Sequence, residues 1–298
     1  MNTRQLQYAI ELYKALNFSI VADRLKISQP ALSKQIAALE NDLGLKLFDR
    51  TTNPLTVTPA GEHFFAGAVK LLYQEDQLLR SMEDFKSGQK GTLNIGISPF
   101  RSLYLIPKIA NKIKEKYPDV KISLHELSSD LLRSQTAEGK FDFAIANLPV
   151  DESALDIIEL EPDTLVLAVP KALASDLPYT NTDSLSSIKL EDCKNLPFVV
   201  VSKTQEMRVL FEKAAALADF EPNISAEVIG LSTAWAMCRA GVGATILPLQ
   251  FINNIEKSDD LVLFKLEQNL TTRQPVIITK KGQYLPEYAK FAIILLTE

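Results

Sequence analysis

Apolar residues in the first 45 positions recur at the spacing of short amphipathic helices. A first helix is predicted over residues 3–16, and a second begins at Ser19, which we expect to be its N-cap. A third begins at Ser28 and ends at Gly44, a residue type that commonly follows the last turn. The third helix carries one apolar stripe, spaced four, three and four residues apart: Leu32, Ile36, Leu39 and Leu43. Its polar residues therefore occupy a different face.

A short β-hairpin and then a long helix are predicted next. Extended pieces at 47–48 and 55–57 flank Asn53 and Pro54, residue types that favour a turn. In the following helix, predicted to residue 86, a coiled-coil spacing of four and three links Phe64, Ala68, Leu71, Glu75, Leu78, Met82 and Phe85. We expect this seam to pair two copies of the chain. The alternative is one long helix that packs on its own domain.

The pattern changes after a polar, glycine-containing segment at residues 87–91. Strands and helices then alternate in the order strand, helix, strand, helix, strand, and the order restarts near residue 198. Such an order predicts two lobes, each built on a parallel sheet with helices on its faces. The last strands and the helix at 286–296 complete the lobes, and we expect the chain to cross back to the first lobe.

The predicted fold class is therefore α/β overall, with an all-α winged helix-turn-helix, a long linker helix and a regulatory domain of two α/β lobes. The expected domains are residues 1–60 for the winged helix-turn-helix, 61–90 for the linker helix and hinge, and 91–298 for the regulatory domain. The lobes are expected at about 91–160 with 268–298, and at about 161–267.

Net charge, the length of apolar runs and the number of cysteines then limit the kinds of function that the chain can have. The 298 residues carry a net charge of −5, yet residues 1–60 hold seven basic residues against five acidic ones. Because this excess is small, DNA binding would require a dimer and well-placed phosphate contacts. No apolar run reaches the roughly 20 residues of a membrane span, and the N-terminus has no apolar signal core, so we expect a cytoplasmic protein that does not contact a membrane. The two cysteines, Cys193 and Cys238, suggest neither a disulfide framework nor a metal site.

Three short helices followed by a hairpin are typical of a winged helix-turn-helix, whose third helix lies in the major groove of DNA. Gln29 and Ser33 are short enough to read base edges, and Gln is suited to adenine. Lys34 and Arg50 are expected to hold phosphates. Each of these residues taken alone is more often a solvated polar residue on an ordinary helix than a DNA contact, but their common face favours an interface with DNA.

Several segments together resemble the N-terminal signature of the LysR-type transcription regulators. They are 18–25 (FSIVADRL), 27–33 (ISQPALS), Ile36, 39–40, 43–44, 47–50 (LFDR) and 55–61 (LTVTPAG), with weaker similarity at 141–145 (FDFAI) and 241–248 (GVGATILP). The resemblance implies that DNA is contacted by Gln29, Pro30, Ser33, Lys34 and Arg50. Two positions depart from the family pattern: Val21 stands where alanine is usual, and Asn53-Pro54 replaces a further basic residue of the wing.

The resemblance also implies a mode of action. The regulatory domain is expected to resemble periplasmic binding proteins, and the chain to form a homodimer or homotetramer through linker helices and regulatory domains. Double-stranded promoter DNA with an interrupted palindrome is the expected partner, with RNA polymerase as a further candidate. A small-molecule effector is expected to change the bending of that DNA. No cofactor and no metal are expected.

The effector is expected between the lobes, because ligands of parallel α/β sheets bind beyond the carboxyl ends of the strands, where helices begin. The candidate residues at these junctions are Ser98, Phe100, Ser128, Asn147, Ser202, Thr204, Ser232 and Thr233. Hydroxyl groups beside helix N-termini suit a small anion such as a carboxylate, phosphate or sulfate. The alternative is that these serines and threonines are ordinary N-caps without a ligand.

Three other function classes are weighed against a regulator. An enzyme is disfavoured because His63 and His125 have no nucleophile or metal-ligand partner at a recognisable spacing, and no glycine-rich nucleotide motif occurs. A transporter's solute-binding protein fits the two lobes but not the missing signal peptide or the N-terminal third. An architectural DNA-binding protein without an effector would have little use for a two-lobed domain of about 200 residues.

Overall fold

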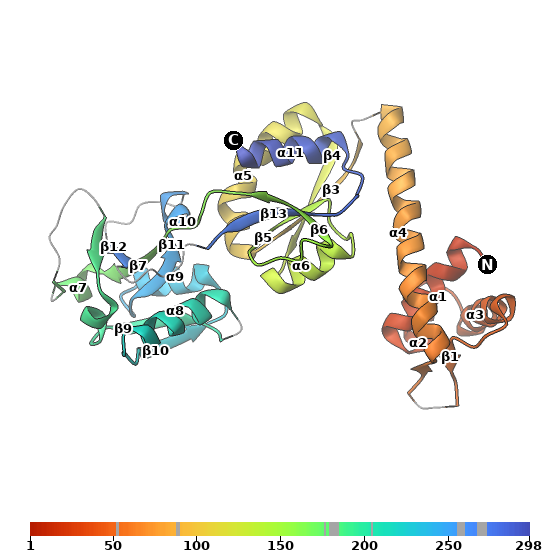
Figure 1. Cartoon of the computed structure of the whole chain (residues 1–298), viewed down its shortest axis with the longest axis horizontal. Coiled ribbons are helices and arrows are strands. Elements are labelled where there is room, and N and C mark those ends of the chain that lie inside the picture. Colours follow the sequence, from red (N-terminus) through yellow and green to blue (C-terminus); the bar gives the residue numbers. More distant parts are fainter. Residues whose placement is uncertain are drawn as a thin grey trace. The chain divides into compact units, whose positions relative to one another are not determined.

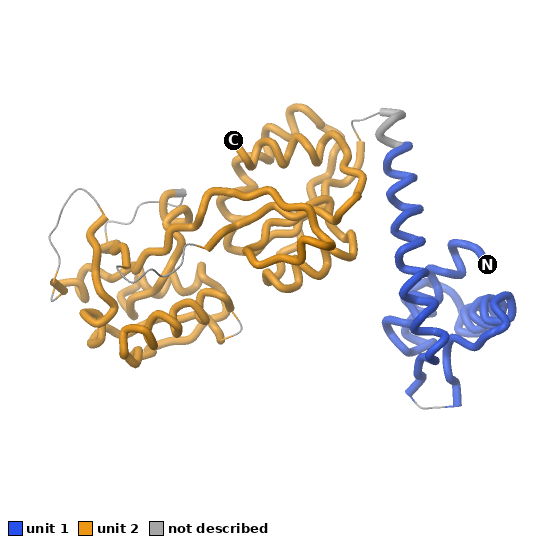
Figure 2. The backbone as a smooth tube through the Cα atoms, in the orientation of Figure 1, with its two compact units in different colours: residues 1–86 blue, residues 87–298 orange. Residues whose placement is uncertain are grey.

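In this computed structural model the chain folds into two compact units, residues 1–86 and 87–298 (Figure 2). The structure describes residues 1–51, 54–87, 90–175, 177–178, 185–203, 205–254, 260–266 and 273–298, without the side chains of 83–87 and 254. The first unit contains α1 (Thr3–Ala15), α2 (Phe18–Arg24), α3 (Gln29–Leu43), β1 (Phe48–Asp49), β2 (Thr56–Val57) and α4 (Pro59–Ser87) (Figure 1).

Capping residues explain where the first three helices begin. The side chain of Asn2 accepts a hydrogen bond from the first turn of α1, and Ser28 caps α3 as expected. The expected cap of α2 at Ser19 is wrong, because the side chain of Asn17 accepts the backbone N–H groups of Ser19 and Ile20. At the other end of α3, Gly44 takes the left-handed conformation with φ of 69°, which a glycine adopts without strain.

The core of the first unit lies between the apolar stripe of α3 and the start of α4. Leu32, Ile36 and Leu39 are fully buried, as the spacing predicted. Phe65 of α4 completes the core, with its ring stacked on that of Tyr13 at 4.5 Å between centroids. The hairpin is confirmed as the antiparallel pair β1 and β2, and Asn53 of its expected turn lies outside the described residues.

The predicted seam of α4 changes its environment along the helix. Ala68 is buried and Phe64 packs partly against the unit's own core. Three later members of the seam face solvent, with exposed fractions of 46% for Leu71, 61% for Leu78 and 45% for Met82. The side chain of Phe85 lies outside the described residues. The first turns of α4 therefore hold the first unit together, whereas the later turns present an apolar stripe without cover in this unit.

The described part of the second unit contains a five-stranded sheet, a four-stranded sheet and a separate pair of strands. The first sheet has the order β4-β3-β5-β13-β6, with β3 parallel to its neighbours β4 and β5 and with β13 antiparallel to both β5 and β6. Its elements are β3 (Lys90–Ile97), α5 (Pro99–Lys116), β4 (Asp119–Glu126), α6 (Ser129–Ala137), β5 (Phe143–Asn147), β6 (Leu155–Glu159), β13 (Pro275–Lys280) and α11 (Glu287–Thr297). We call this part lobe one.

The other sheet, in lobe two, has the order β11-β7-β12-β8, and a parallel pair of strands, β9 and β10, lies beside it. The strands are β7 (Leu165–Pro170), β8 (Ser186–Ile188), β9 (Pro197–Val201), β10 (Asn223–Val228), β11 (Thr245–Pro248) and β12 (Leu261–Leu266). The helices are α7 (Lys171–Ala174), a 3-10 turn at Leu190–Cys193, α8 (Glu206–Leu217), α9 (Leu231–Arg239) and α10 (Leu249–Asn254).

The expectation of parallel sheets holds only for the strands that helices connect. β3, β4 and β5 are parallel, and so are β9 and β10. The sheets as wholes are mixed, because β13 enters lobe one on the return from lobe two and runs against β5. In lobe two β7 pairs antiparallel with both β11 and β12. Figure 1 shows the return in blue, with β13 inserted between β5 and β6.

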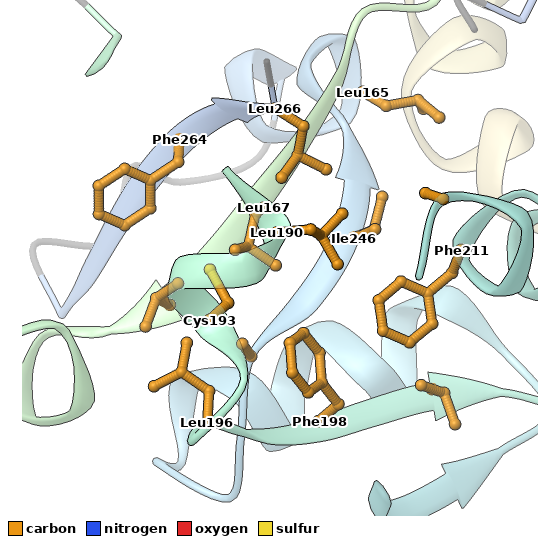
Figure 3. Close-up of a cluster of buried hydrophobic side chains, with 14 of the residues drawn as sticks. Leu165, Leu167, Leu190, Cys193, Leu196, Phe198, Phe211, Ile246, Phe264 and Leu266 are labelled. Atoms are coloured by element: carbon orange, nitrogen blue, oxygen red, sulfur yellow. The ribbon is translucent and has the colours of Figure 1, made fainter. Parts of the chain in front are cut away.

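Each lobe has its own apolar core. In lobe two, fully buried side chains from β7, β9, β12 and α8 gather around Phe198 and Phe264 (Figure 3). In lobe one, residues of β3, α5 and α11 form the corresponding core. A further apolar cluster joins the lobes, because Phe100 of α5 stacks on Phe251 of α10 with 3.9 Å between ring centroids. The two lobes are therefore joined by packed side chains as well as by the two segments of chain that pass between them, after β6 and before β13.

Two glycines of α4 give a matched test of the packing in the first unit. A Cβ at Gly61 would lie 2.3 Å from the carbonyl oxygen of Leu47, whereas Gly67 has nothing within 4 Å. We expect Gly61→Ala to lower the free energy of unfolding by about 1–3 kcal/mol through overpacking. Gly67→Ala should raise it by up to about 1 kcal/mol, because alanine favours the helix. Amide hydrogen exchange in residues 1–86 measures both, and equal effects would contradict the packing described.

Candidate functional site

The exposed face of α3 carries four of the five predicted DNA contacts. Gln29, Pro30 and Lys34 are exposed and Ser33 is half-buried, on the side opposite the buried stripe. Pro30 lies in the first turn, where its fixed φ suits a helix and its missing N–H removes no hydrogen bond. The structure thus brings these four side chains to one surface, with Gln29 at the first position of the helix.

Arg50, the fifth predicted contact, is engaged within the unit. Its Nη1 donates to Ser33 Oγ at 3.3 Å and its Nη2 to Glu40 Oε2 at 3.2 Å. The guanidinium also lies over the ring of Phe18, 5.2 Å from the ring centroid. Arg50, which follows β1, therefore joins the hairpin to α3.

Sequence reasoning did not single out Glu40. Its side chain is wholly buried and accepts the backbone N–H groups of Leu47 at 3.0 Å and Phe48 at 3.2 Å. Lys46 Nζ lies 3.3 Å from the same carboxylate. The sequence did carry one signal for this site, because Glu40 directly follows Leu39 of the apolar stripe of α3. A glutamate is almost never buried beside such a stripe unless cations or hydrogen-bond donors pair with it.

A cavity of about 450 Å³ lies between the two lobes of the second unit. Five of the eight predicted effector residues line it: Ser98, Phe100, Ser128, Asn147 and Ser232. Ser202 and Thr233 are not among its described lining residues, and Thr204 lies outside the described part of the chain. The strand-to-helix junctions of both lobes thus meet at one cavity, whose size is that of an ordinary small-molecule site.

The lining residues differ in what they offer a ligand. The amide of Asn147 is already used, because Oδ1 accepts from Arg101 at 2.6 Å and Nδ2 donates to Glu206. The side chain of Ser98 caps α5 by accepting the N–H of Arg101 at 3.4 Å. Ser128 occupies the N-cap position of α6 but makes no capping hydrogen bond. Among the junction residues that the structure describes, Ser98 is an ordinary N-cap, whereas Ser128 makes no capping bond and Gly230 precedes α9 in place of Ser232 or Thr233.

Four helices begin at the cavity. Their first residues are Pro99 of α5, Ser129 of α6, Glu206 of α8 and Leu231 of α9. The N-cap residues of α6, α8 and α9, which are Ser128, Gln205 and Gly230, make no capping hydrogen bond through a side chain. Among the described residues, the N–H groups of these first turns therefore lack the partner that such a cap supplies. Such helix ends attract negative charge through these N–H groups and the helix dipole.

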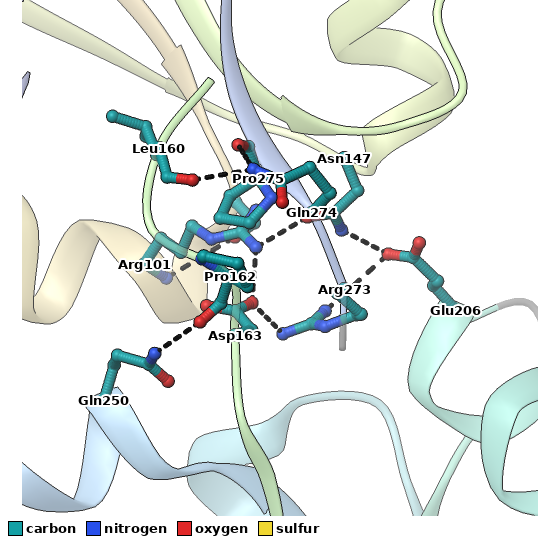
Figure 4. Close-up of polar contacts among 11 residues, drawn as sticks. Arg101, Asn147, Leu160, Pro162, Asp163, Glu206, Gln250, Arg273, Gln274 and Pro275 are labelled. Atoms are coloured by element: carbon teal, nitrogen blue, oxygen red, sulfur yellow. Dashed lines mark hydrogen bonds and ion pairs between the residues drawn. The ribbon is translucent and has the colours of Figure 1, made fainter. Parts of the chain in front are cut away.

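A buried ionic network forms one wall of the cavity (Figure 4). Asp163 Oδ2 accepts from Arg101 Nη2 at 2.6 Å and from Arg273 Nη2 at 2.8 Å. Arg273 Nη1 also lies 3.6 Å from Glu206, which belongs to α8 of lobe two. Burial lowers the pKa of Arg273, and the charge of Arg101 lowers it further, while Asp163 and Glu206 oppose this. Arg273 Nε is buried and has no hydrogen-bond partner among the described residues.

The arginines of the cavity were missed in the sequence. Arg101 and Arg133 each lie on an amphipathic helix, where a charged residue is normally read as solvated. Arg133 Nη1 donates to the carbonyl of Asn147 at 3.1 Å, and its guanidinium also contacts Asp130. The partner of Arg101 is 62 residues away and Arg273 reaches Asp163 across 110, so no local pattern reveals either contact.

Comparison with family models identifies both units. Residues 3–62 match a model described as a bacterial regulatory helix-turn-helix protein of the lysR family, and residues 86–298 match the LysR substrate binding domain. The chain belongs to the LysR family. The resemblance noted in the sequence is thereby confirmed, and so is the predicted fold of a helix-turn-helix joined to a two-lobed α/β domain.

Relatives within the LysR family match along most of their length. The chain is 30% identical over 290 residues to the HTH-type transcriptional regulator AlsR of Bacillus subtilis, covering 96% of this chain and 92% of AlsR. It is 29% identical over 297 residues to a protein of the same organism named the uncharacterized HTH-type transcriptional regulator YcgK, covering 96% of this chain and 90% of YcgK. These curated relatives are transcription regulators.

Solved structures of LysR regulators share the fold. Full-length OxyR from Pseudomonas aeruginosa, a variant protein, matches with a TM-score of 0.71 and 22% identity over 100% of this chain and 98% of that one. Full-length CbnR in complex with its target DNA matches with a TM-score of 0.64 and 21% identity over 99% of both chains.

Both cysteines of this LysR-family chain, Cys193 and Cys238, are buried free thiols. Burial raises the pKa of Cys193 to about 12, with a contribution from Asp192, and burial likewise raises that of Cys238 to about 12. Both thiols therefore stay protonated near neutral pH, where reactive cysteines are thiolates. The described residues contain no group of three or more potential metal-ligating side chains. Nor is any helix of the described part long and apolar enough to cross a membrane.

The carboxylate of Asp163 is expected to dominate the stability of this LysR-type second unit. Asp163→Asn removes the carboxylate that two buried guanidinium groups share and leaves Arg273 with Glu206 at 3.6 Å as its nearest remaining carboxylate. Breaking a buried pair in this way typically costs about 3–5 kcal/mol. The matched control is Glu287→Gln, which removes an exposed ion pair with Lys290 and should change stability by under about 1 kcal/mol. Urea unfolding followed by the fluorescence of Trp235, the only tryptophan, measures both. Similar small losses in the two variants would contradict this account of the network.

Proposed function

We propose that this chain binds promoter DNA through α3 and the wing of one unit and regulates transcription in response to a small anion bound between the lobes of the other. The observation that carries the proposal is the joining, in one chain, of an exposed recognition-helix face and a cavity of about 450 Å³ where three uncapped helices begin. Two relatives that are named as HTH-type transcriptional regulators support it, because the alignment covers 90% and 92% of their own lengths.

The proposed DNA contacts are the exposed residues of α3. Gln29 at the start of the helix is suited to adenine, and Ser33 and Pro30 lie beside it. Lys34 is placed to hold a phosphate, which fixes the register of the helix in the groove. Arg50 was expected to hold a phosphate as well. Its contacts with Ser33 and Glu40 favour a positioning role over a phosphate contact, since they support the face that reads the bases.

The proposed effector carries an acidic group. The uncapped first turns of α6, α8 and α9 supply backbone N–H donors, and Arg133 and Arg273 supply positive charge at the same cavity. Ser98, Phe100, Ser128, Asn147 and Ser232 are the proposed lining residues, with Ser202, Thr204 and Thr233 as further candidates. Apolar side chains such as Met207 and Leu231 also line the cavity, so the ligand is expected to have an apolar part.

The proposal also covers the oligomeric state of the protein and its location in the cell. The exposed stripe of Leu71, Leu78 and Met82 on α4 is suited to pairing with a second copy, so a homodimer or homotetramer is proposed. Two copies also place two recognition helices on one DNA, which compensates for the small positive charge of each. The protein is proposed to be cytoplasmic and not an enzyme, with RNA polymerase as a further partner.

The proposed mechanism couples the two units through the lobes. A ligand that binds differently to two arrangements of the lobes shifts the population toward one of them. In the assembled protein this changes the relative placement of the DNA-binding units and thus the bend of the DNA.

The anion is tested with the full-length protein and a panel of inorganic anions and small carboxylates. A ligand that binds the native state raises the melting temperature, so at least one anion should do so. Arg133→Ala should remove most of that shift, whereas Arg239→Ala should leave it, because Arg239 is exposed and does not line the cavity. Equal loss in both variants, or shifts only with neutral compounds, would count against an anionic effector.

The proposed roles on α3 are tested by two alanine variants. Gln29→Ala should reduce the preference for the selected site over other sequences by about 1–3 kcal/mol, because it removes a base contact. Lys34→Ala should weaken binding to every sequence and make the salt dependence shallower by about one unit. Fluorescence anisotropy with a duplex selected from a randomised pool, at several salt concentrations, separates these effects. The assignment of roles is overturned if the two variants behave alike.

A further inference from the structure

Glu40 is a buried carboxylate in a unit whose function depends on positive charge. It lies near the end of α3 with its side chain wholly buried. Its oxygens accept from two backbone N–H groups of the wing, those of Leu47 and Phe48. They also hold two cations, Lys46 at 3.3 Å and Arg50 at 3.2 Å. One side chain thus fixes the start of the wing and neutralises two basic residues next to the recognition helix.

Lys46 and Arg50 are two of the seven basic residues that the DNA-binding unit could place against phosphates. Residues 1–60 carry seven basic residues. Lys14 and Arg24 pair with Glu11, and Lys46 and Arg50 pair with Glu40. Lys34, on the exposed face of α3, has no carboxylate within ion-pair distance among the described residues. Since affinity for any DNA sequence rises with the number of phosphates neutralised, cations held by Glu40 lower the sequence-independent part of binding.

We propose that Glu40 determines the sequence specificity of the DNA-binding unit. It withholds Lys46 and Arg50 from the phosphates, and through Arg50 it fixes Ser33 on the base-reading face. Glu40 is a positioning residue, because it touches no base itself. The inference rests on the proposed DNA binding and adds to it a residue that limits binding to wrong sequences.

Its contacts within the unit favour an Arg50 side chain that stays on Glu40 and Ser33 over one that moves to a phosphate. One guanidinium nitrogen is on Glu40, another is on Ser33, and the plane lies over Phe18. Moving to a phosphate would leave a buried carboxylate with fewer donors, which is unfavourable. The backbone donors of Leu47 and Phe48 keep Glu40 in place in any case.

Glu40→Gln separates the two kinds of contact that Glu40 makes, those with the backbone N–H groups of Leu47 and Phe48 and those with the two cations. The glutamine carbonyl can still accept from the wing N–H groups, whereas its amide nitrogen cannot accept from Lys46 or Arg50. The two cations are then released toward solvent and phosphate. The matched control is Glu11→Gln, which also removes one negative charge and releases two cations, Lys14 and Arg24, but touches neither the recognition helix nor the wing.

The experiment measures binding of the full-length protein to the selected duplex and to a scrambled duplex of the same composition, across salt concentrations. For Glu40→Gln we expect binding to the scrambled duplex to tighten and its salt slope to steepen by about one to two units per DNA-binding unit. The ratio of the two affinities should fall about tenfold or more, within the usual effect of lost base contacts. Adding Arg50→Ala and Lys46→Ala to Glu40→Gln should return the slope to its original value.

Three outcomes would overturn the proposal. Equal slopes in Glu40→Gln and Glu11→Gln would assign the effect to net charge alone. Weaker binding to both duplexes with an unchanged slope would assign Glu40 a purely structural role. If Glu40→Gln does not fold, Arg50→Ala alone decides: a slope for the scrambled duplex that is one unit shallower would mean that Arg50 already holds a phosphate. Absence of any selected duplex would instead contradict the proposed function itself.

Discussion

One buried carboxylate, that of Asp163, holds the two chain crossings of the second unit together. The chain leaves lobe one after β6 and passes Asp163, and it returns past Arg273 before β13. The backbone N–H of Asp163 donates to the carbonyl of Arg273 at 2.8 Å, and its side chain accepts from Arg101 and Arg273. Since removing one partner of a buried ion pair is strongly destabilising, these contacts tie the outgoing and returning segments of the chain together. Arg101 and Arg273 also line the cavity, and Arg273 lies just before β13.

The same network connects the cavity to the arrangement of the lobes. Arg101 and Asn147 belong to lobe one, whereas Glu206 is the first residue of α8 in lobe two. Asn147 and Arg273 both contact Glu206, so the polar contact between the lobes lies at the cavity itself. Under the proposed function, an anion at Arg273 or at the start of α8 competes with Glu206 and thereby changes what holds the lobes. The stacked rings of Phe100 and Phe251 limit how far the lobes can separate.

The sequence predicted what depends on local pattern. The apolar stripe of α3, the cap at Ser28 and the end at Gly44 follow from residue types within a few positions, and all are confirmed. The cap of α2 was misplaced because Asn17 and Ser19 are both good N-caps two residues apart. The junction serines that line the cavity could be found because helices of parallel α/β folds begin at the ligand side.

The charged contacts could not be predicted, because their partners are distant in sequence. Arg101 and Arg273 look like ordinary surface residues until the fold places Asp163 against them, 62 and 110 residues away in the sequence. The mixed sheets have the same origin, since the direction of β13 is set by the return from lobe two. Periodicity therefore located the elements and the junctions, whereas the ionic network required the tertiary structure.

The central claim is that a ligand in the cavity changes how this chain holds DNA. The most direct measurement is a DNase footprint and bend angle on the duplex selected by the full-length protein, with and without an anion that raises its melting temperature. We expect an interrupted palindromic footprint whose extent and bend change when the anion is saturating, and no change when Arg133 is replaced by alanine. Identical footprints and bend angles with and without the bound anion would contradict it.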